Sequence, residues 1–364
     1  MTALRSRLTD WTVVVPLLAI VVLGMTWNQV LSGPMVLLLS VLLAGAVLAA
    51  VHHAEVVAHK VGEPLGSLVL AVAVTVIEVA LIVTLMINGG EKTQTLARDT
   101  VFAAAMITCN GILGLSLLIG ALRRRVAVFN SEGTGGALAT VATLAVLSLV
   151  VPNFTARPGP QFSSAQLAFA AGASLSLYAL FVLVQTGRHR DYFQPVTAEG
   201  RPVDSEEHAE PPSTCTALIS LALLLVALVA VVGDAKTVSP TIEAVVARVN
   251  LPPSFVGVVI ALLVLLPETL AAARAARLDR VQISLNLALG SAMASIGLTI
   301  PVIAIASIWL DGPLLLGLGG TQMTLLALTV VTAVLTVVPG RATVLQGGVH
   351  LVLLAAFVFL AASP

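Results

Sequence analysis

Two lone glutamates, Glu78 and Glu268, stand inside otherwise apolar stretches of this 364-residue sequence. Twelve residues, Phe255–Leu266, offer no polar side chain before Pro267 and the second acid. A helix that begins near Ser254 carries Glu268 about 21 Å along its axis, well inside a hydrocarbon core about 30 Å thick. A carboxylate at this depth is costly and usually faces a cavity, a partner or an ion path. The alternative is a protonated glutamate that bonds to a neighbouring helix.

The proline before the second acid adds to its chemistry. Pro267 donates no backbone hydrogen bond, so the carbonyl of Leu263 is left as a polar oxygen near Glu268. Two carboxylates that face each other in a low-dielectric site cannot comfortably both ionise, so one of them binds a proton. A cation between them restores both charges, and its departure favours protonation again. This competition is the chemistry needed to exchange protons for a metal ion, and oxygen ligands suit a hard cation such as Ca²⁺.

Few other polar groups accompany the two acids. Thr75 lies one helical turn before Glu78, and Asn110, Asn286 and Ser291 lie in the segments that follow the acids. Their oxygens are suited to complete a cation shell. The alternatives are a bond from the threonine to its own backbone and, for the others, packing between helices, where small and polar residues are common.

The elements that carry these groups must be membrane helices. The sequence is 58% hydrophobic and 10% charged, and no soluble core absorbs that much apolar sequence. At about 20 apolar residues per span, it predicts an all-α polytopic membrane protein with about eleven transmembrane helices. The first apolar run is long and lacks a clean cleavage site, so we interpret it as a retained span. The expected spans are residues 11–30, 35–60, 66–87, 100–122, 136–151, 164–185, 216–232 with a possible continuation over 241–249, 254–276, 281–310, 313–338 and 343–362.

The basic residues predict the orientation of these spans. With a cytoplasmic N-terminus, thirteen Lys and Arg residues fall on the inside and five on the outside. This bias is typical of a multi-pass protein of the plasma membrane, with the lipid bilayer as its partner. Lys+Arg and Asp+Glu both number 18, and no basic tract indicates nucleic acid. Cys109 and Cys215 have no ligand spacing, so they imply no disulfide framework.

An internal repeat appears when Glu78 is aligned with Glu268. Upstream, Glu55 then meets Glu243, each followed five positions later by a basic residue. Pro64 falls within a residue of a proline pair in the second copy. The alternative is chance pairing between apolar segments of low complexity.

The repeat divides the chain into four parts. Residues 1–33 hold the N-terminal tail and first span, 34–186 the first repeat, 187–213 a polar, acidic cytoplasmic linker and 214–364 the second repeat. Each repeat has five expected helices, an odd number, so the copies are inverted in the membrane. Inverted repeats place their substrate near the bilayer midplane.

A polar cluster at the expected cytoplasmic end of the second span has two interpretations. One is a proton path, because histidine titrates near neutral pH; the other is a set of interfacial residues at a helix end. For the proton path the candidates are Glu55, His53 and Glu63 on the inside, with Glu243 in the matching place outside.

The segments around both acids resemble the paired α-repeats of the cation/proton exchanger branch of the Ca²⁺:cation antiporter superfamily, and within it the ChaA-type cation/proton antiporters. They are GEPLGSLVLAVAVTVIEVALI with RDTVFAAAMITCNGILGLSLL, and VIALLVLLPETLAAARAARLDRVQISLNLALGSAMASIGLTIPV. The resemblance implies one extra N-terminal helix plus two inverted five-helix repeats. It also implies central acids at Glu78 and Glu268, with small and amide residues at Asn110, Gly290 and Ser291.

One departure concerns the identity of the ion. The calcium exchangers of this superfamily commonly carry Gly-Asn-x-x-Glu in both repeats. Here Thr75 and Leu265 stand three positions before the acids, so two amide oxygens are missing. This leaves Na⁺ or K⁺ open beside Ca²⁺.

The prediction is a secondary antiporter that exports a cation, Ca²⁺ before Na⁺ or K⁺, and imports protons by alternating access. It needs no cofactor, and its only substrates are the cation and the protons. A passive cation channel is a weaker alternative, since it does not need inverted acidic repeats. An enzyme is not expected, because the HExxH spacing of metalloproteases is absent. There is also no P-loop, so the transport is driven by an ion gradient.

Overall fold

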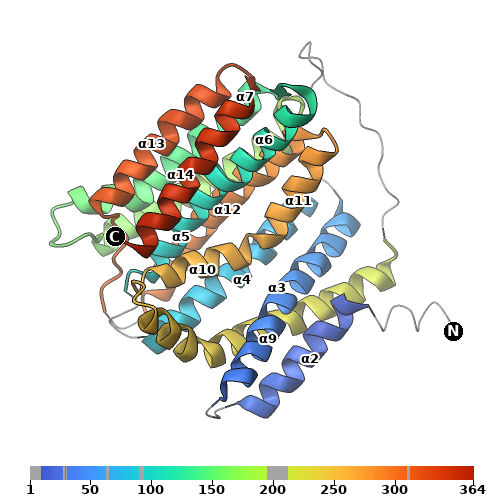
Figure 1. The fold of residues 1–364 in the computed structure, drawn as a ribbon, viewed down its shortest axis with the longest axis vertical. Coiled ribbons are helices and arrows are strands. Elements are labelled where there is room, and N and C mark those ends of the chain that lie inside the picture. Colours follow the sequence, from blue (N-terminus) through green and yellow to red (C-terminus); the bar gives the residue numbers. More distant parts are fainter. Residues whose placement is uncertain are drawn as a thin grey trace. The chain divides into compact units, whose positions relative to one another are not determined.

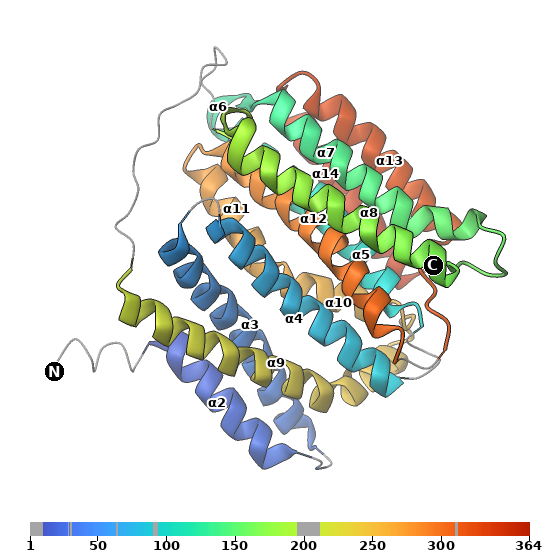
Figure 2. The ribbon, with the colours of Figure 1, turned by 180° about the vertical axis from the view of Figure 1, so that it is seen from behind.

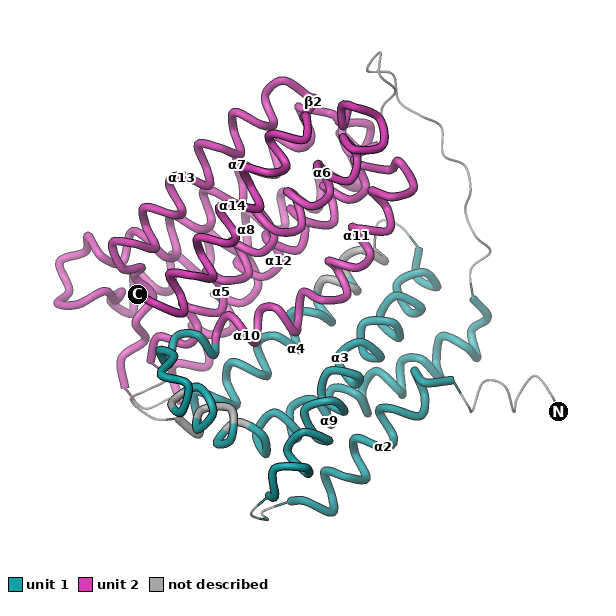
Figure 3. The backbone as a smooth tube through the Cα atoms, viewed as in Figure 1, with its two compact units in different colours: residues 1–93, 208–256 teal, residues 94–207, 257–364 magenta. Residues whose placement is uncertain are grey.

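The computed structural model describes residues 10–27, 29, 31–62, 65–89, 94–194, 212–309 and 312–364. The regular secondary structure of the described part is helical apart from one ladder of two-residue strands. Two compact units emerge, residues 1–93 with 208–256 (unit 1) and residues 94–207 with 257–364 (unit 2), which Figure 3 colours separately.

The helices are those of a membrane protein. Among the described residues, eight are long and apolar enough to cross a membrane, or nine if one sharply bent pair counts as a span. Two further apolar helices, Trp11–Thr26 and Val72–Ile87, are shorter. A helix satisfies its own backbone hydrogen bonds, which the bilayer core requires. The predicted all-α polytopic class is therefore confirmed, while the count of eleven spans and the inverted repeat stay predictions.

The described residues of unit 1 form four helices (Figure 1). They are α2 (Trp11–Thr26), α3 (Gly33–Val61), α4 (Leu65–Gly89) and α9 (Thr214–Arg248). The most extensive contact of the unit joins α3 to α9. Both faces carry fully buried alanines, among them Ala46 and Ala50 of α3 and Ala227 and Ala230 of α9. Small side chains allow the two backbones to approach closely.

Helix α2 packs where α3 and α9 each present a glycine. A Cβ atom on Gly45 would lie 2.7 Å from Cγ1 of Val15, and one on Gly233 would overlap the Leu23 side chain. Val15 and Leu23 are eight positions apart and so lie on one face of α2. The two glycines therefore allow one apolar face of α2 to contact both long helices.

Unit 2 contains the remaining elements, seen from both sides in Figures 1 and 2. They are α5 (Leu96–Met106), η2 (Ile107–Ile112), α6 (Leu113–Arg124), β1 (Ala127–Val128), α7 (Ser131–Ala145), η3 (Val146–Val150), η4 (Val151–Phe154), α8 (Ser164–Leu183), η5 (Val184–Arg188), η6 (Arg190–Phe193), α10 (Phe255–Val264), α11 (Leu266–Arg277), α12 (Val281–Ala306), α13 (Gly320–Val337), β2 (Arg341–Ala342) and α14 (Val344–Ala362). The continuous helix through α5, η2 and α6 is buried over most of its length. Helix α14 packs along α6, and α8 packs along α12.

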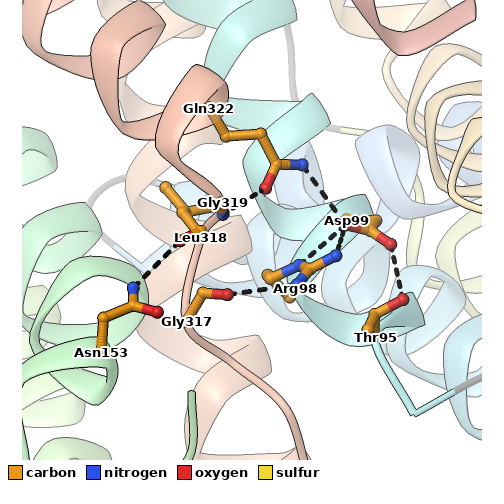
Figure 4. A network of polar contacts seen from close by, with 8 residues as sticks. All are labelled: Thr95, Arg98, Asp99, Asn153, Gly317, Leu318, Gly319 and Gln322. Carbon is orange, nitrogen blue, oxygen red and sulfur yellow. Dashed lines mark hydrogen bonds and ion pairs between the residues drawn. The ribbon is translucent and has the colours of Figure 1, made fainter. Parts of the chain in front are cut away.

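The predicted span over residues 313–338 begins too early, because α13 starts only at Gly320. Residues 313–319 are not helical, yet their backbone has partners. Arg98 donates from Nη1 to the Gly317 carbonyl at 3.1 Å, and Asn153 donates from Nδ2 to the Leu318 carbonyl at 3.1 Å (Figure 4). Side chains from distant parts of the sequence thus replace the bonds that a helix would supply.

The same network anchors the start of α5. Arg98 and Asp99 form an ion pair at 2.8 Å, with both side chains largely buried. The Asp99 carboxylate also accepts from the Thr95 hydroxyl at 2.8 Å and from Gln322 of α13 at 3.5 Å (Figure 4). A buried carboxylate with several donors holds its elements together, since removing one donor leaves it uncompensated.

Candidate cation site

Glu78 lies near the middle of α4 and is 2% exposed. Its nearest neighbours in the sequence, Ile77 and Val79, are also buried. Thr75, one turn earlier, is 5% exposed and shares the face of the acid, because residues three apart are neighbours on a helix. Unit 1 therefore presents a hydroxyl and a carboxyl on one buried face of an apolar helix.

Glu268 has a different local setting. Helices α10 and α11 meet at Leu265 with a bend of 52°, where a single span had been predicted over residues 254–276. Pro267 explains the break, since it cannot donate to the Leu263 carbonyl and its ring crowds the preceding turn. The bend puts Glu268 in the first turn of α11. Free N–H groups at a helix N-terminus favour negative charge, an advantage that Glu78 in mid-helix lacks.

The two acids belong to different units, Glu78 to unit 1 and Glu268 to unit 2. Glu78 stands in an apolar helix, and Glu268 stands just after the apolar helix α10. Their pairing across the repeat stays a prediction.

Asn110 lies in the π-helical turn η2 and is fully buried. Its Nδ2 donates to Oγ1 of Thr329 in α13 at 2.9 Å, and its Oδ1 lies 3.0 Å from Nδ1 of His350 in α14. Because an amide oxygen only accepts, the hydrogen of that contact belongs to His350 Nδ1. The other ring nitrogen, Nε2, lies 3.2 Å from Oγ1 of Thr336. Single π-turns within α-helices often mark functional sites.

Sequence reasoning missed His350, whose only signal was a histidine in an apolar C-terminal span. Two glycines bring it to Asn110. A Cβ atom on Gly114 would lie 2.8 Å from Cβ of His350, and one on Gly347 would lie 2.7 Å from the backbone nitrogen of Leu118. The backbones of α6 and α14 therefore touch, and the imidazole reaches η2.

We expect His350→Leu to lower the thermal stability of the purified protein. The substitution leaves Asn110 Oδ1 buried without its donor, which costs about 1–3 kcal/mol. The measurement is the unfolding midpoint in detergent, with Val352→Ala on the exposed side of the same helix as the control. Equal midpoints for His350→Leu and the parent would mean that the contact contributes nothing.

The α12 candidates have unequal surroundings. Asn286 accepts from Gln282 at 2.9 Å and donates to the Phe193 carbonyl at 2.6 Å, so it holds the turn η6. Ser291 is half-buried. A Cβ atom on Gly290 would meet nothing within 4 Å. No protein atom therefore crowds α12 at Gly290, and the Ser291 hydroxyl stands next to this position.

The start of the predicted linker is ordered. A Cβ atom on Gly133 of α7 would overlap the backbone of Tyr192, and the Phe193 ring meets Phe181 edge-on at 5.6 Å. Residues up to 194 are thus packed on unit 2, whereas residues 195–211 lie outside the described part of the chain.

The proton-path candidates that the structure describes, His53 and Glu55, differ in their surroundings. His53 is 3% exposed, and its Nε2 donates to the Thr12 carbonyl at 2.9 Å. That carbonyl lacks its helical donor because the residue four positions later is Pro16. Glu55 is exposed. The side chain of Glu243, on α9, and the whole of Glu63 lie outside the described residues.

Comparisons with known proteins cover nearly the whole chain. The sodium/calcium exchanger protein family matches residues 31–187 and 219–362. The ionic transporter y4hA of Sinorhizobium fredii is 46% identical over 97% of this chain and 96% of its own. The sodium-potassium/proton antiporter ChaA of Escherichia coli is 34% identical over 98% of this chain and 97% of its own.

Two solved structures share the fold at 16% identity. The native YfkE structure has a TM-score of 0.72 and covers 97% of this chain and 98% of its own. The H⁺/Ca²⁺ exchanger CAX has a TM-score of 0.69, with 95% of this chain and 90% of its own covered.

Proposed function

Since this chain belongs to the sodium/calcium exchanger protein family, we propose that it is a secondary transporter that exchanges a metal cation for protons across the plasma membrane. The resemblance to ChaA-type antiporters is confirmed by the relative that is 34% identical. We propose export of the cation and import of protons by alternating access, with the N-terminus in the cytoplasm.

The observation that carries the proposal is Glu78, a carboxyl group 2% exposed in the middle of an apolar membrane helix. In the proposed cycle Glu78 and Glu268 bind the cation together as carboxylates. When the cation leaves, the two negative charges repel each other and protons from the opposite side of the membrane replace it. Cation and protons thus compete for one pair of acids, which couples their movements.

We propose the remaining ligands of the cation from the few polar side chains that accompany the two acids in the sequence. Thr75 offers a hydroxyl oxygen, and Ser291 offers a hydroxyl beside the open position at Gly290. The amide oxygens of Asn110 and Asn286 each accept one hydrogen bond already. An amide oxygen has two lone pairs, so each retains one for a cation.

We propose Ca²⁺ as the exported cation, because a hard cation with several oxygen ligands fits two carboxylates and a set of hydroxyl, amide and carbonyl oxygens. The test is a panel of Ca²⁺, Na⁺ and K⁺ in everted membrane vesicles, with dequenching of a pH-sensitive dye as the measure of proton efflux. Ca²⁺ is expected to release protons at the lowest concentration. Cation flux without proton movement would indicate a channel and contradict antiport.

A second candidate is Na⁺(K⁺)/H⁺ exchange. One residue pair favours it: Thr75 and Leu265 stand three positions before the acids, where an amide would supply a further oxygen to Ca²⁺. Monovalent cations need fewer charged and amide ligands.

This difference yields a prediction on specificity. Thr75→Asn combined with Leu265→Asn adds two amide oxygens and should raise the apparent affinity for Ca²⁺ over Na⁺ about tenfold, the equivalent of one hydrogen-bond-sized interaction of about 1.4 kcal/mol. The measurement is the half-saturating concentration of each cation in the vesicle assay. Thr84→Asn, on the same α4 helix, is the control and should leave the ratio unchanged. An unchanged ratio in the double variant would show that these positions do not select the ion.

A further inference from the structure

Asp234 is a fully buried acid that the proposed exchange mechanism does not use. It lies in α9, within the part that can span a membrane, Thr214–Val238. The buried residues nearest to it on the same helical face are apolar; they are Ala227, Ala230, Val231 and Val238. The spacing of three, four and seven positions puts Asp234 in line with them. The carboxyl group therefore lies on the buried face of a helix whose most extensive contact is with α3.

Neither oxygen of the Asp234 carboxyl group has a hydrogen-bond partner in the described part of the chain. Its own backbone neighbour Gly233 lies under Leu23 of α2, so the apolar face of α2 covers this region. Nothing in these contacts gives Asp234 a bonding role in the fold. An acid with no bonding role at a buried position of a membrane helix calls for another explanation.

The charged groups of the surrounding helices do not compensate it. Helix α2 has no titratable side chain between its first and last residues. Those of α3 lie in its last ten residues, and α4 contributes Glu78; they are His52, His53, Glu55, His59, Lys60 and Glu78. On α9 itself, Lys236 is exposed and lies 5.3 Å over the Trp27 ring, and Arg248 is exposed. Among the described residues none of these groups forms an ion pair with Asp234.

The protonation state follows from this environment. A buried carboxylate that no protein donor contacts is far more costly in apolar surroundings than a neutral carboxyl group. This cost favours the protonated form of Asp234. Water that reaches the buried face of α9 would solvate the carboxylate and allow the proton to leave.

We propose that Asp234 is a second proton-binding site, distinct from Glu78 and Glu268, which takes a proton from a hydronium ion when water reaches the buried face of α9 and returns it to water when that face is hydrated again. This role rests on the proposed function, because it assumes that the protein moves protons. A proton on Asp234 would move without competing with the cation for Glu78 and Glu268. The proposal predicts that proton movement depends on Asp234 as well as on the acid pair Glu78 and Glu268.

The first test is chemical labelling of the intact protein. Dicyclohexylcarbodiimide reacts with protonated carboxyl groups in apolar surroundings: the acid oxygen bonds to the carbodiimide carbon and the acid proton moves to its nitrogen. In a Glu78→Gln/Glu268→Gln background, peptide mass spectrometry should find the label on Asp234, with less at high pH. No label on Asp234 at any pH would overturn the proposal. Labelling needs no transport, so its outcome is separate from that of the proposed exchange.

The second test is the pH profile of cation exchange in proteoliposomes. Asp234→Asn should remain active and shift the pH of half-maximal exchange by about one unit, equivalent to a tenfold change in proton affinity. Asp234→Glu, which keeps an acid, should stay near the parent profile, and Lys236→Gln, two positions on and exposed, should match the parent. An active Asp234→Asn with the parent profile would overturn the proposal. If Asp234→Asn does not fold, the labelling result decides.

Discussion

Replacing Glu78 or Glu268 by glutamine is expected to lower proton-coupled cation exchange at least about 100-fold, since removing one partner from a set of buried charges costs about 3 kcal/mol or more. Glutamine keeps the size and one oxygen of the side chain but neither binds a proton at this site nor balances a cation. Both substrates should therefore lose their site together. Aspartate at either position keeps the charge but shortens the reach, so we expect reduced exchange rather than none.

The measurement is cation-dependent proton flux in everted vesicles at equal amounts of membrane-inserted protein. Glu132→Gln is the matched control, since Glu132 is an exposed acid in the first turn of α7. Full flux in both Glu78→Gln and Glu268→Gln would eliminate the proposed mechanism. Loss of flux in only one of the two variants would mean that a single acid, and not a shared pair, is essential for exchange.

Replacing Gly347 by leucine is expected to destabilise unit 2 by about 3 kcal/mol or more, at the upper end of the cost of inserting bulk into a packed core. A Cβ atom at this position would lie 2.7 Å from the Leu118 nitrogen, 2.9 Å from its Cα and 3.0 Å from the Gly114 carbonyl oxygen. These are backbone atoms, which cannot rotate away as a side chain would. Helices α6 and α14 would have to separate, and His350 would lose its contact with Asn110.

The adjacent residue is a matched control for this prediction. A Cβ atom on Gly348 would meet nothing within 4 Å, so Gly348→Leu adds the same bulk and the same helix propensity outside the contact. The unfolding midpoint in detergent should fall for Gly347→Leu and stay near the parent for Gly348→Leu. A similar drop in both variants would assign the effect to bulk on α14 in general.

Several features of the fold could be predicted from the sequence because neighbouring residues in the chain determine them. Pro267 was expected to free the Leu263 carbonyl within one span, and the structure bends by 52° where α10 meets α11. The possible continuation of the seventh span is confirmed, since α9 runs to Arg248 despite Pro240. The predicted start of α13 was wrong because distant residues determine it. Arg98 and Asn153 bond the backbone just before α13, and both lie more than 150 positions away in the chain.

The surroundings of the candidate site were predicted less completely. Thr75 and Glu78 share a buried face as the helical spacing required. Asn110 was proposed as a ligand, but its bond with His350 joins residues 240 positions apart, and no spacing in the sequence indicates such a contact. In the sequence, Asp234 is only an acid beside a glycine in an apolar span. The structure distinguishes it from an acid at the membrane interface, because its carboxyl group is buried and has no hydrogen-bond partner in the described part of the chain.

By itself, the sequence determined the class of the protein and singled out two candidate acids, because the apolar character of each span and the cost of a charge within it depend on residues close together in the chain. The tertiary structure alone decided which side chains have partners. Helix contacts at Gly45, Gly233 and Gly347 bring distant residues together, and these contacts determine whether a buried polar group is satisfied or, like Asp234, is left to hold a proton.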